Sequence, residues 1–246
     1  MRCTVIGSWG GCCRKEEACS SVLLSHDGFP FLLDCGSGVL SVLQNVLDLN
    51  DLHHIFLSHY HFDHYSDAGS AIYARLVNTQ IGKTDQKLHF YALDDQHKFP
   101  ELTWDPYSQA TAITADSVLH IGPFTCTFLK TKHPVDCLAI RAEAGGQCVV
   151  YTADTAFFPE LIDFARGADL LISECSLYAG GHGERAGHMT SEQAGQLAQQ
   201  AGCPRLLLTH LPLYGDLDQL RIQAQQHFHG QLLMAKKLMT LDWEEK

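Results

Sequence analysis

The 246-residue sequence contains no long apolar run and little proline, and each absence excludes a class of protein. Its longest apolar stretches, such as Leu206–Leu208, are far shorter than the ~20 residues that a membrane-spanning helix needs. With 8 prolines and 20 glycines, the composition is not that of collagen or of a low-complexity chain. We therefore expect a globular protein without a membrane partner, and we expect no signal peptide at its start.

Positive charge is also scarce. The chain has 17 lysines and arginines against 28 acidic residues, which gives a formal charge of −11, and it has no basic run. Such a chain does not hold a polyanion by neutralising phosphates with its own side chains. Ten cysteines are present without any CxxC pair, several of them inside apolar runs, so we interpret them as reduced thiols of a cytoplasmic protein.

Strand-like and helix-like patterns alternate along the chain without a linker or a strong internal repeat. Hairpins mixed with strand–helix units predict packed sheets covered by helices, in one domain spanning residues 1–246. For the helix predicted over 191–201, Thr190 or Ser191 is the expected N-cap, and Gly202 is the expected left-handed residue at its C-terminal end. The predicted strands are 4–7, 21–25, 30–34, 54–58, 88–92, 124–131, 138–142, 148–152, 170–173, 206–209 and, as the last, 232–235; the predicted helices are 39–49, 68–77, 191–201 and 218–227.

Histidine is in excess, with 15 residues, and four residues of metal-ligand type follow directly after the predicted buried strand 54–58. His59 and His61 alternate along an extended segment, so their imidazoles point to the same side. Asp63 and His64 follow where the chain turns and can face a second ion. The alternative to a metal site is a histidine-rich surface loop.

Three further residues, His133, Asp154 and His210, each follow a predicted strand. Alone, each is most simply a polar group that ends a strand. Together with the cluster they complete the six to eight ligand atoms, roughly, that two zinc ions with open positions require, provided that Asp154 bridges the ions.

The segment His59-Tyr60-His61-Phe62-Asp63-His64, with the later His, Asp and His, resembles the HxHxDH pattern of metallo-β-lactamase-fold hydrolases. Asp34-Cys35-Gly36 resembles the early Asp-x-Gly element of that family. The resemblance implies an α+β fold, a four-layer αββα sandwich of two mixed sheets. It also implies two divalent ions, zinc with manganese or iron as alternatives. One ion is assigned to His59, His61, His133 and Asp154, and the other to Asp63, His64, Asp154 and His210.

Two further elements resemble the ribonuclease Z branch of the family. His188-Met189-Thr190, continued to Ala194, resembles its His-x-Thr-x-x-Gln-Ala segment, and Ser173-Glu174-Cys175 its His-Glu-Ala-Thr element. The resemblance implies that His188 lies beside the scissile phosphate and that Glu174 orients it. The alternative is a histidine next to a helix cap and a surface carboxylate. However, Glu174 ends a buried strand, where an unpaired carboxylate is costly.

The interval between His133 and Asp154 departs from that branch, because it has room only for a hairpin turning at Gly145-Gly146 and not for a tRNA-gripping arm. It resembles small relatives such as phosphoribosyl cyclic phosphodiesterases, which carry a cysteine-rich structural zinc site. Cys12, Cys13 and Cys19 lie in a comparable place, but their spacing is poor for such a site, and free thiols are the default interpretation.

We therefore expect a binuclear metal-dependent hydrolase, a phosphodiesterase that acts on small, cyclic or single-stranded nucleotide phosphodiesters by metal-activated hydroxide. Asp63, His188 and Glu174 are the predicted catalytic residues. The expected partner is a small phosphodiester rather than a structured tRNA, and a homodimer is left open. Three alternatives stay open: a tRNA 3′-endoribonuclease, a thioester, lactone or β-lactam hydrolase, and a non-catalytic metal- or nucleic-acid-binding module on the same fold.

Overall fold

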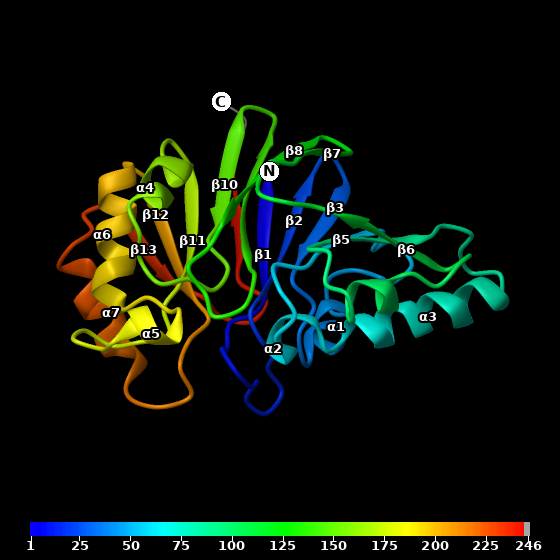
Figure 1. Ribbon diagram of the computed structural model, residues 1–246, viewed down its shortest axis with the longest axis horizontal. Coiled ribbons are helices and arrows are strands. Elements are labelled where there is room, and N and C mark those ends of the chain that lie inside the picture. The colour runs from blue at the N-terminus through cyan, green and yellow to red at the C-terminus, as the bar shows by residue number, and fades with distance from the viewer. Residues whose placement is uncertain (244–246) are drawn as a thin grey trace. The chain divides into compact units, whose positions relative to one another are not determined.

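The computed structural model describes residues 1–243, which form two compact units. The first unit comprises Met1–Ile113 and the C-terminal residues from Lys236, and the second comprises Thr114–Ala235. Each unit is built on one seven-stranded sheet (Figure 1). The expectation of a single domain over residues 1–246 stays a prediction.

The sheet of the first unit has the strand order β14-β1-β2-β3-β4-β5-β6. The pairs from β14 to β3 are antiparallel and those from β3 to β6 are parallel. The hairpin predicted at Asp27-Gly28 is confirmed, and both residues have the positive φ that a tight two-residue turn requires. The strands are β1 Arg2–Gly7, β2 Ser21–His26, β3 Phe29–Leu33, β4 His54–Phe56, β5 Leu88–Ala92, β6 Ser108–Ala112 and β14 Thr240–Asp242.

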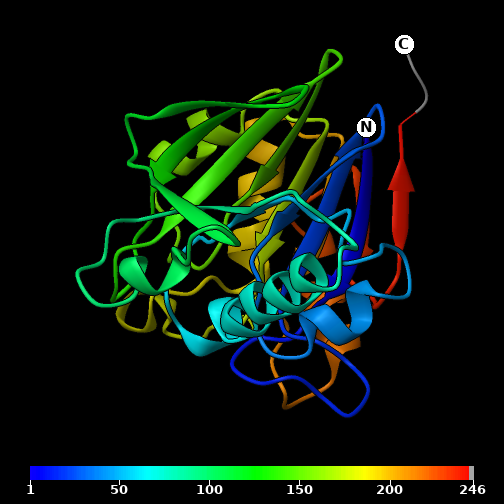
Figure 2. The ribbon, with the colours of Figure 1, turned by 90° about the vertical axis from the view of Figure 1, so that its right-hand side faces the viewer.

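Helices cover one face of this sheet (Figure 2). Alternate residues of a strand point to the same side of the sheet. Leu88 and Phe90 of β5 therefore share one apolar cluster with buried helix residues such as Leu43 and Ile72. The period-2 pattern of the strands and the period-3.6 pattern of the helices thus meet in one apolar core. The helical segments are α1 Val39–Leu43, α2 Phe62–Tyr65, α3 Ala68–Gln80 and the 3₁₀ helix η1 Phe99–Leu102.

The sheet of the second unit has the order β13-β12-β11-β10-β9-β8-β7, antiparallel from β7 to β10 and parallel from β10 to β13. Its strands are β7 Val118–Ile121, β8 Phe124–Lys130, β9 Leu138–Ala144, β10 Gln147–Tyr151, β11 Leu170–Glu174, β12 Arg205–Thr209 and β13 Gln231–Met234. Its helices are α4 Glu160–Ala165, α5 Gly183–Ala186, α6 Ser191–Ala201 and α7 Leu217–Gln225. Helix α6 packs against α4, α7 and the strands β11 and β12 (Figure 1).

The ends of α6 are those expected from the sequence. Thr190 is the N-cap: its hydroxyl accepts from Gln193 N, and the Gln193 side chain accepts from Thr190 N, which makes a reciprocal capping box. Gly202 ends the helix in the left-handed conformation, with φ 69°. The capping box fixes the start of α6 and with it the end of the preceding loop, which contains His188.

Several elements differ from the expectation. The helix predicted over 39–49 ends at Leu43, because the Asn45 side chain donates to the carbonyls of Ser41 and Val42, competing with the main chain for the helix acceptors. Strands β6, β7 and β14 were not predicted, and β14 follows the strand expected to be the last. β14 has three residues and β6 is largely polar, so neither carries a strong alternating apolar pattern.

Within each sheet, parallel strands end at the same edge, and polar residues follow these ends. In the first unit, Asp34 follows β3, and the cluster of His59, His61, Asp63 and His64 follows β4. In the second unit, Asp154 follows β10, Glu174 ends β11 and His210 follows β12. Among residues 1–243 no helix is long and apolar enough to cross a membrane.

Candidate metal centre

Asp34 anchors the candidate site in the first unit. It follows β3 directly, with φ 59°, and its side chain is fully buried. Its main-chain N–H donates to Phe56 O of the neighbouring parallel strand β4, and its carbonyl accepts from Ser21 Oγ at 2.8 Å. These bonds hold a non-glycine residue in the left-handed region, which turns the carboxylate toward the segment that follows β4.

The Asp34 carboxylate orients two of the predicted metal ligands. Its Oδ2 accepts from His64 Nδ1 at 2.8 Å and from Ser58 Oγ at 2.9 Å, while Oδ1 accepts from Ser58 N. Because the Ser58 hydroxyl proton goes to the carboxylate, Oγ accepts from His59 Nδ1, at 3.0 Å. Both imidazoles therefore carry their proton on Nδ1 and keep the Nε2 lone pair, the form that binds a metal ion.

His61 and Asp63 complete this half of the site. His61 is the N-cap of α2, and its Nδ1 lies 3.1 Å from His59 Nε2. Asp63 Oδ2 accepts from Gly11 N at 2.7 Å and lies 3.5 Å from His64 Nε2. The cluster is thus not a solvated loop: His59 and His64 are fully buried, and every member has a defined neighbour.

Asp154, His133 and His210 are the predicted ligands of the second unit. Thr131 Oγ1 donates to Asp154 O at 2.8 Å, and Asp154 Oδ2 lies 3.4 Å from His210 Nε2. His133 Nδ1 donates to Gly187 O at 3.0 Å, so His133 also keeps its lone pair on Nε2. As at Asp34, positive φ values turn the chain at these strand ends, 49° at Ala153 and 52° at His210.

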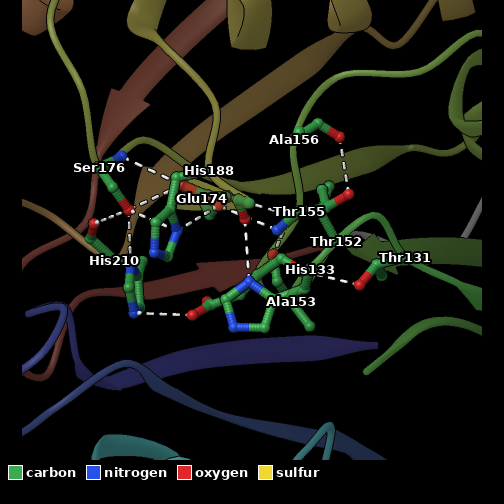
Figure 3. A network of polar contacts seen from close by, with 12 residues as sticks. Thr131, His133, Thr152, Ala153, Thr155, Ala156, Glu174, Ser176, His188 and His210 are labelled. Atoms are coloured by element: carbon green, nitrogen blue, oxygen red, sulfur yellow. Dashed lines mark hydrogen bonds and ion pairs between the residues drawn. The ribbon is translucent and has the colours of Figure 1, made fainter. Parts of the chain in front are cut away.

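Glu174 is the centre of the polar network in this unit (Figure 3). Its carboxylate is fully buried and accepts four hydrogen bonds. Oε1 accepts from Thr155 N at 3.0 Å and from His188 Nδ1 at 2.8 Å, and Oε2 accepts from Ser176 N at 3.2 Å and Ser176 Oγ at 2.7 Å. The alternative of a surface carboxylate is therefore wrong.

His188 lies in the loop between α5 and α6 and is half-buried. It offers a ligand-type atom within 4.8 Å of those of Asp154 and His210, and its ring stacks at 5.4 Å on that of His210. With Nδ1 held by Glu174, its Nε2 is the atom that can exchange a proton. The predicted pairing of His188 with Glu174 is thus present in the structure.

The N-terminal cysteines Cys12, Cys13 and Cys19 differ in their exposure to solvent. Cys19 is buried, and burial first and the Asp63 charge second raise the pKa of its thiol to about 12, so it stays protonated at neutral pH. Cys12 is exposed and its Sγ contacts Cys13 O. Within residues 1–243, no group of three or more clustered ligand-type side chains includes a cysteine.

Sequence reasoning assigned no role to Ser58 or Ser176. The structure places Ser58 in the hydrogen-bond network of Asp34 and Ser176 in that of Glu174. Ser58 and Ser176 each join a buried carboxylate to a histidine. Ser58 directly precedes His59, and Ser176 lies two residues after Glu174. That proximity was the only local signal, because the histidine partner of Ser176 is 34 positions away.

The sequence pattern of the beta-lactamase superfamily domain matches residues 30–211, about three quarters of the chain. The chain therefore belongs to this superfamily, and the metallo-β-lactamase fold implied by the HxHxDH motif is confirmed.

The probable metallo-hydrolase YhfI of Bacillus subtilis is 44% identical over 237 residues, which are 96% of this chain and 97% of that protein. A crystal structure of YhfI matches with a TM-score of 0.96 at 43% identity, covering 98% of both chains. The protein is thus a metal-dependent hydrolase.

Two solved structures are similar in fold alone. The short form of human tRNase Z has a TM-score of 0.78 at 19% identity, with 98% of this chain and 99% of that chain covered. A diphosphatase from the PhnP family has a TM-score of 0.75 at 16% identity, with 99% and 98% covered.

Gly36 generates a prediction for the half-site of the first unit. A Cβ at this position would collide with the main-chain carbonyl of Asp63, so Gly36→Ala must displace α2. We expect a loss of about 1–3 kcal/mol in the free energy of unfolding and a reduced metal content. Gly69→Ala is the matched control. Gly69 lies in helix α3, and a Cβ added there meets nothing within 4 Å. Urea unfolding and elemental analysis measure both effects. Equal stability and metal content in the two variants would contradict the role of this close approach.

Proposed function

We propose that this hydrolase is a binuclear phosphodiesterase acting on small, cyclic or single-stranded nucleotide phosphodiesters. The observation that carries the proposal is the His188–Glu174 pair, a half-buried imidazole held at 2.8 Å by a fully buried carboxylate beside Asp154 and His210. An oriented acid–base histidine is of most use when the leaving group is a poor one, such as the alkoxide of an unactivated phosphodiester. A thioester releases a good leaving group and has little need of it.

The donor set fits divalent metal ions. Four histidines, His59, His64, His133 and His210, have Nδ1 engaged by a carboxylate, a serine or a carbonyl, which leaves Nε2 as the ligand atom. We assign the ions to the ligand sets that the family resemblance implies, with Asp154 shared. Nitrogen and oxygen donors suit zinc, manganese or iron. When bound, two such ions polarise a phosphoryl oxygen, lower the pKa of coordinated water and supply about four positive charges.

The side chains of this protein supply the proton transfers. Asp63, held by the amide of Gly11, accepts the proton of the attacking water. His188 donates from Nε2 to the leaving oxygen, while Glu174 fixes its Nδ1 and stabilises the imidazolium form. Because the Glu174 carboxylate accepts four hydrogen bonds, it remains an acceptor throughout the reaction.

The hairpin between His133 and Asp154 supports a small substrate. β9 ends at Ala144 and β10 begins at Gln147, and these two residues pair across Gly145-Gly146. No arm interrupts this part of the chain, as the sequence predicted. With 17 lysines and arginines and a formal charge of −11, the protein offers few cations for the dispersed phosphate contacts that a folded tRNA requires.

Substrate range is the direct test of this function. Purified protein with Zn²⁺ or Mn²⁺ is compared on a cyclic nucleotide, bis(p-nitrophenyl) phosphate, a thioester, a chromogenic β-lactam and an intact precursor tRNA. We expect hydrolysis of the small phosphodiesters and poor 3′ processing of the precursor. Efficient cleavage of the tRNA at sub-micromolar concentration would favour the endoribonuclease alternative. Turnover of the thioester or β-lactam alone would place the enzyme in another substrate class.

Asp154 generates a prediction about the metal ions. Since one carboxylate serves both ions in the assigned sets, Asp154→Ala should weaken both. Asp136→Ala is the control, because its exposed carboxylate lies between His133 and Asp154 in sequence and pairs with the surface amine of Lys130. Metal stoichiometry after dialysis is the measurement. A single tight ion that survives Asp154→Ala would exclude the bridging assignment.

His188 generates a prediction that separates a ligand from a catalytic residue. His188→Ala should lower kcat on an unactivated phosphodiester by on the order of 10²–10⁴-fold while both ions are retained. The exposed His182, N-cap of α5, provides the control variant His182→Ala. Loss of metal would identify His188 as a ligand, and full activity would refute its acid–base role. A nitrophenyl ester is unsuitable here, because its leaving group needs little protonation.

A further inference from the structure

Ser176 lies between the Glu174 carboxylate and the imidazole of His210. Its hydroxyl is 2.7 Å from Glu174 Oε2 and 2.7 Å from His210 Nδ1, and 3.4 Å from His188 Nδ1 (Figure 3). Glu174 therefore contacts the two histidines in different ways, His188 directly and His210 through a serine.

The number of protons on Ser176 Oγ decides the direction of these bonds. A hydroxyl has one proton, and of the two groups near Ser176 Oγ that only accept, the ionised Glu174 Oε2 at 2.7 Å is closer than His210 O at 3.3 Å, so the proton goes to Glu174 Oε2. The 2.7 Å contact with His210 is then one in which Oγ accepts and Nδ1–H donates. The remaining nitrogen of His210, Nε2, keeps its lone pair and lies 3.4 Å from Asp154 Oδ2.

The same arrangement occurs independently in the first unit. There Ser58 Oγ donates to Asp34 Oδ2 at 2.9 Å and accepts from His59 Nδ1 at 3.0 Å, while His64 contacts the carboxylate directly. A serine between a buried carboxylate and a histidine thus occurs twice, after different strands and with different carboxylates.

We propose that Ser176 is a positioning residue that fixes His210 in its metal-binding tautomer and connects this ligand to the Glu174–His188 pair. This inference rests on the ligand role that the proposed function gives to His210. Removing the hydroxyl deprives His210 Nδ1 of its acceptor and Glu174 Oε2 of a donor, whereas the 2.8 Å bond between Glu174 and His188 does not pass through Ser176. The first effect of its loss is therefore on metal binding.

The test compares zinc affinities, by competition with a chelator, of the wild-type protein, Ser176→Ala, Ser176→Thr and Ser173→Ala. Ser173 is the matched control: it is fully buried in β11, but its hydroxyl donates to the main-chain carbonyl of Glu174. We expect Ser176→Ala to weaken one of two ions about 10–100-fold, and Ser176→Thr, which keeps a hydroxyl, to bind nearly as the wild type does. Wild-type affinity in Ser176→Ala, or an equal loss in Ser173→Ala, would overturn the inference.

A second measurement does not depend on how well Thr fits. Long-range ¹H–¹⁵N spectra of the metal-free protein report which ring nitrogen of His210 carries the proton. We expect Nδ1–H in the wild type and a mixture of tautomers in Ser176→Ala, and unchanged spectra would overturn the inference. Neither readout needs a substrate. If the wild type cleaves no phosphodiester but Ser176→Ala loses zinc affinity, the proposed function fails while the role of Ser176 stands.

Discussion

A carboxylate withdrawn from water must keep its hydrogen bonds, and the candidate site depends on this constraint at two positions. Asp34 and Glu174 are both fully buried, and stripping such a charge of partners costs several kcal/mol. Their partners are the histidines and serines of the site. The hydrogen bonds that keep the carboxylates satisfied therefore also keep the imidazoles of the predicted ligands oriented.

The two sheets follow one plan, with antiparallel strands leading into parallel ones and polar residues where the parallel strands end. Within that plan the two carboxylates have diverged. Asp34 orients two predicted ligands, His59 and His64, whereas Glu174 orients one predicted ligand, His210, and the proposed acid–base residue His188. Under the proposed function, equivalent scaffolds would thus serve metal binding in one unit and both metal binding and proton transfer in the other.

Sequence reasoning succeeded where the information is local. The alternation of His59 and His61, the N-cap at Thr190 and the hairpin at Asp27-Gly28 are all set by neighbours a few residues apart. It failed where long-range pairing decides the contact, as for Ser176 and His210, which meet only because β11 and β12 run side by side. It also failed where a polar side chain overrode an apolar pattern, as Asn45 does at the end of α1.

The turn between β9 and β10 can change in length independently of the predicted ligands. Gly145 and Gly146 are exposed, and both adopt positive φ, 57° and 72°. On either side, the β9–β10 ladder and the bond from Thr131 to Asp154 fix the chain independently of what the turn contains. Because lengthening an exposed loop costs little free energy, an insertion or deletion at this turn would leave the predicted ligands where they are. The length of this turn can therefore change while the residues that follow β10 keep their places.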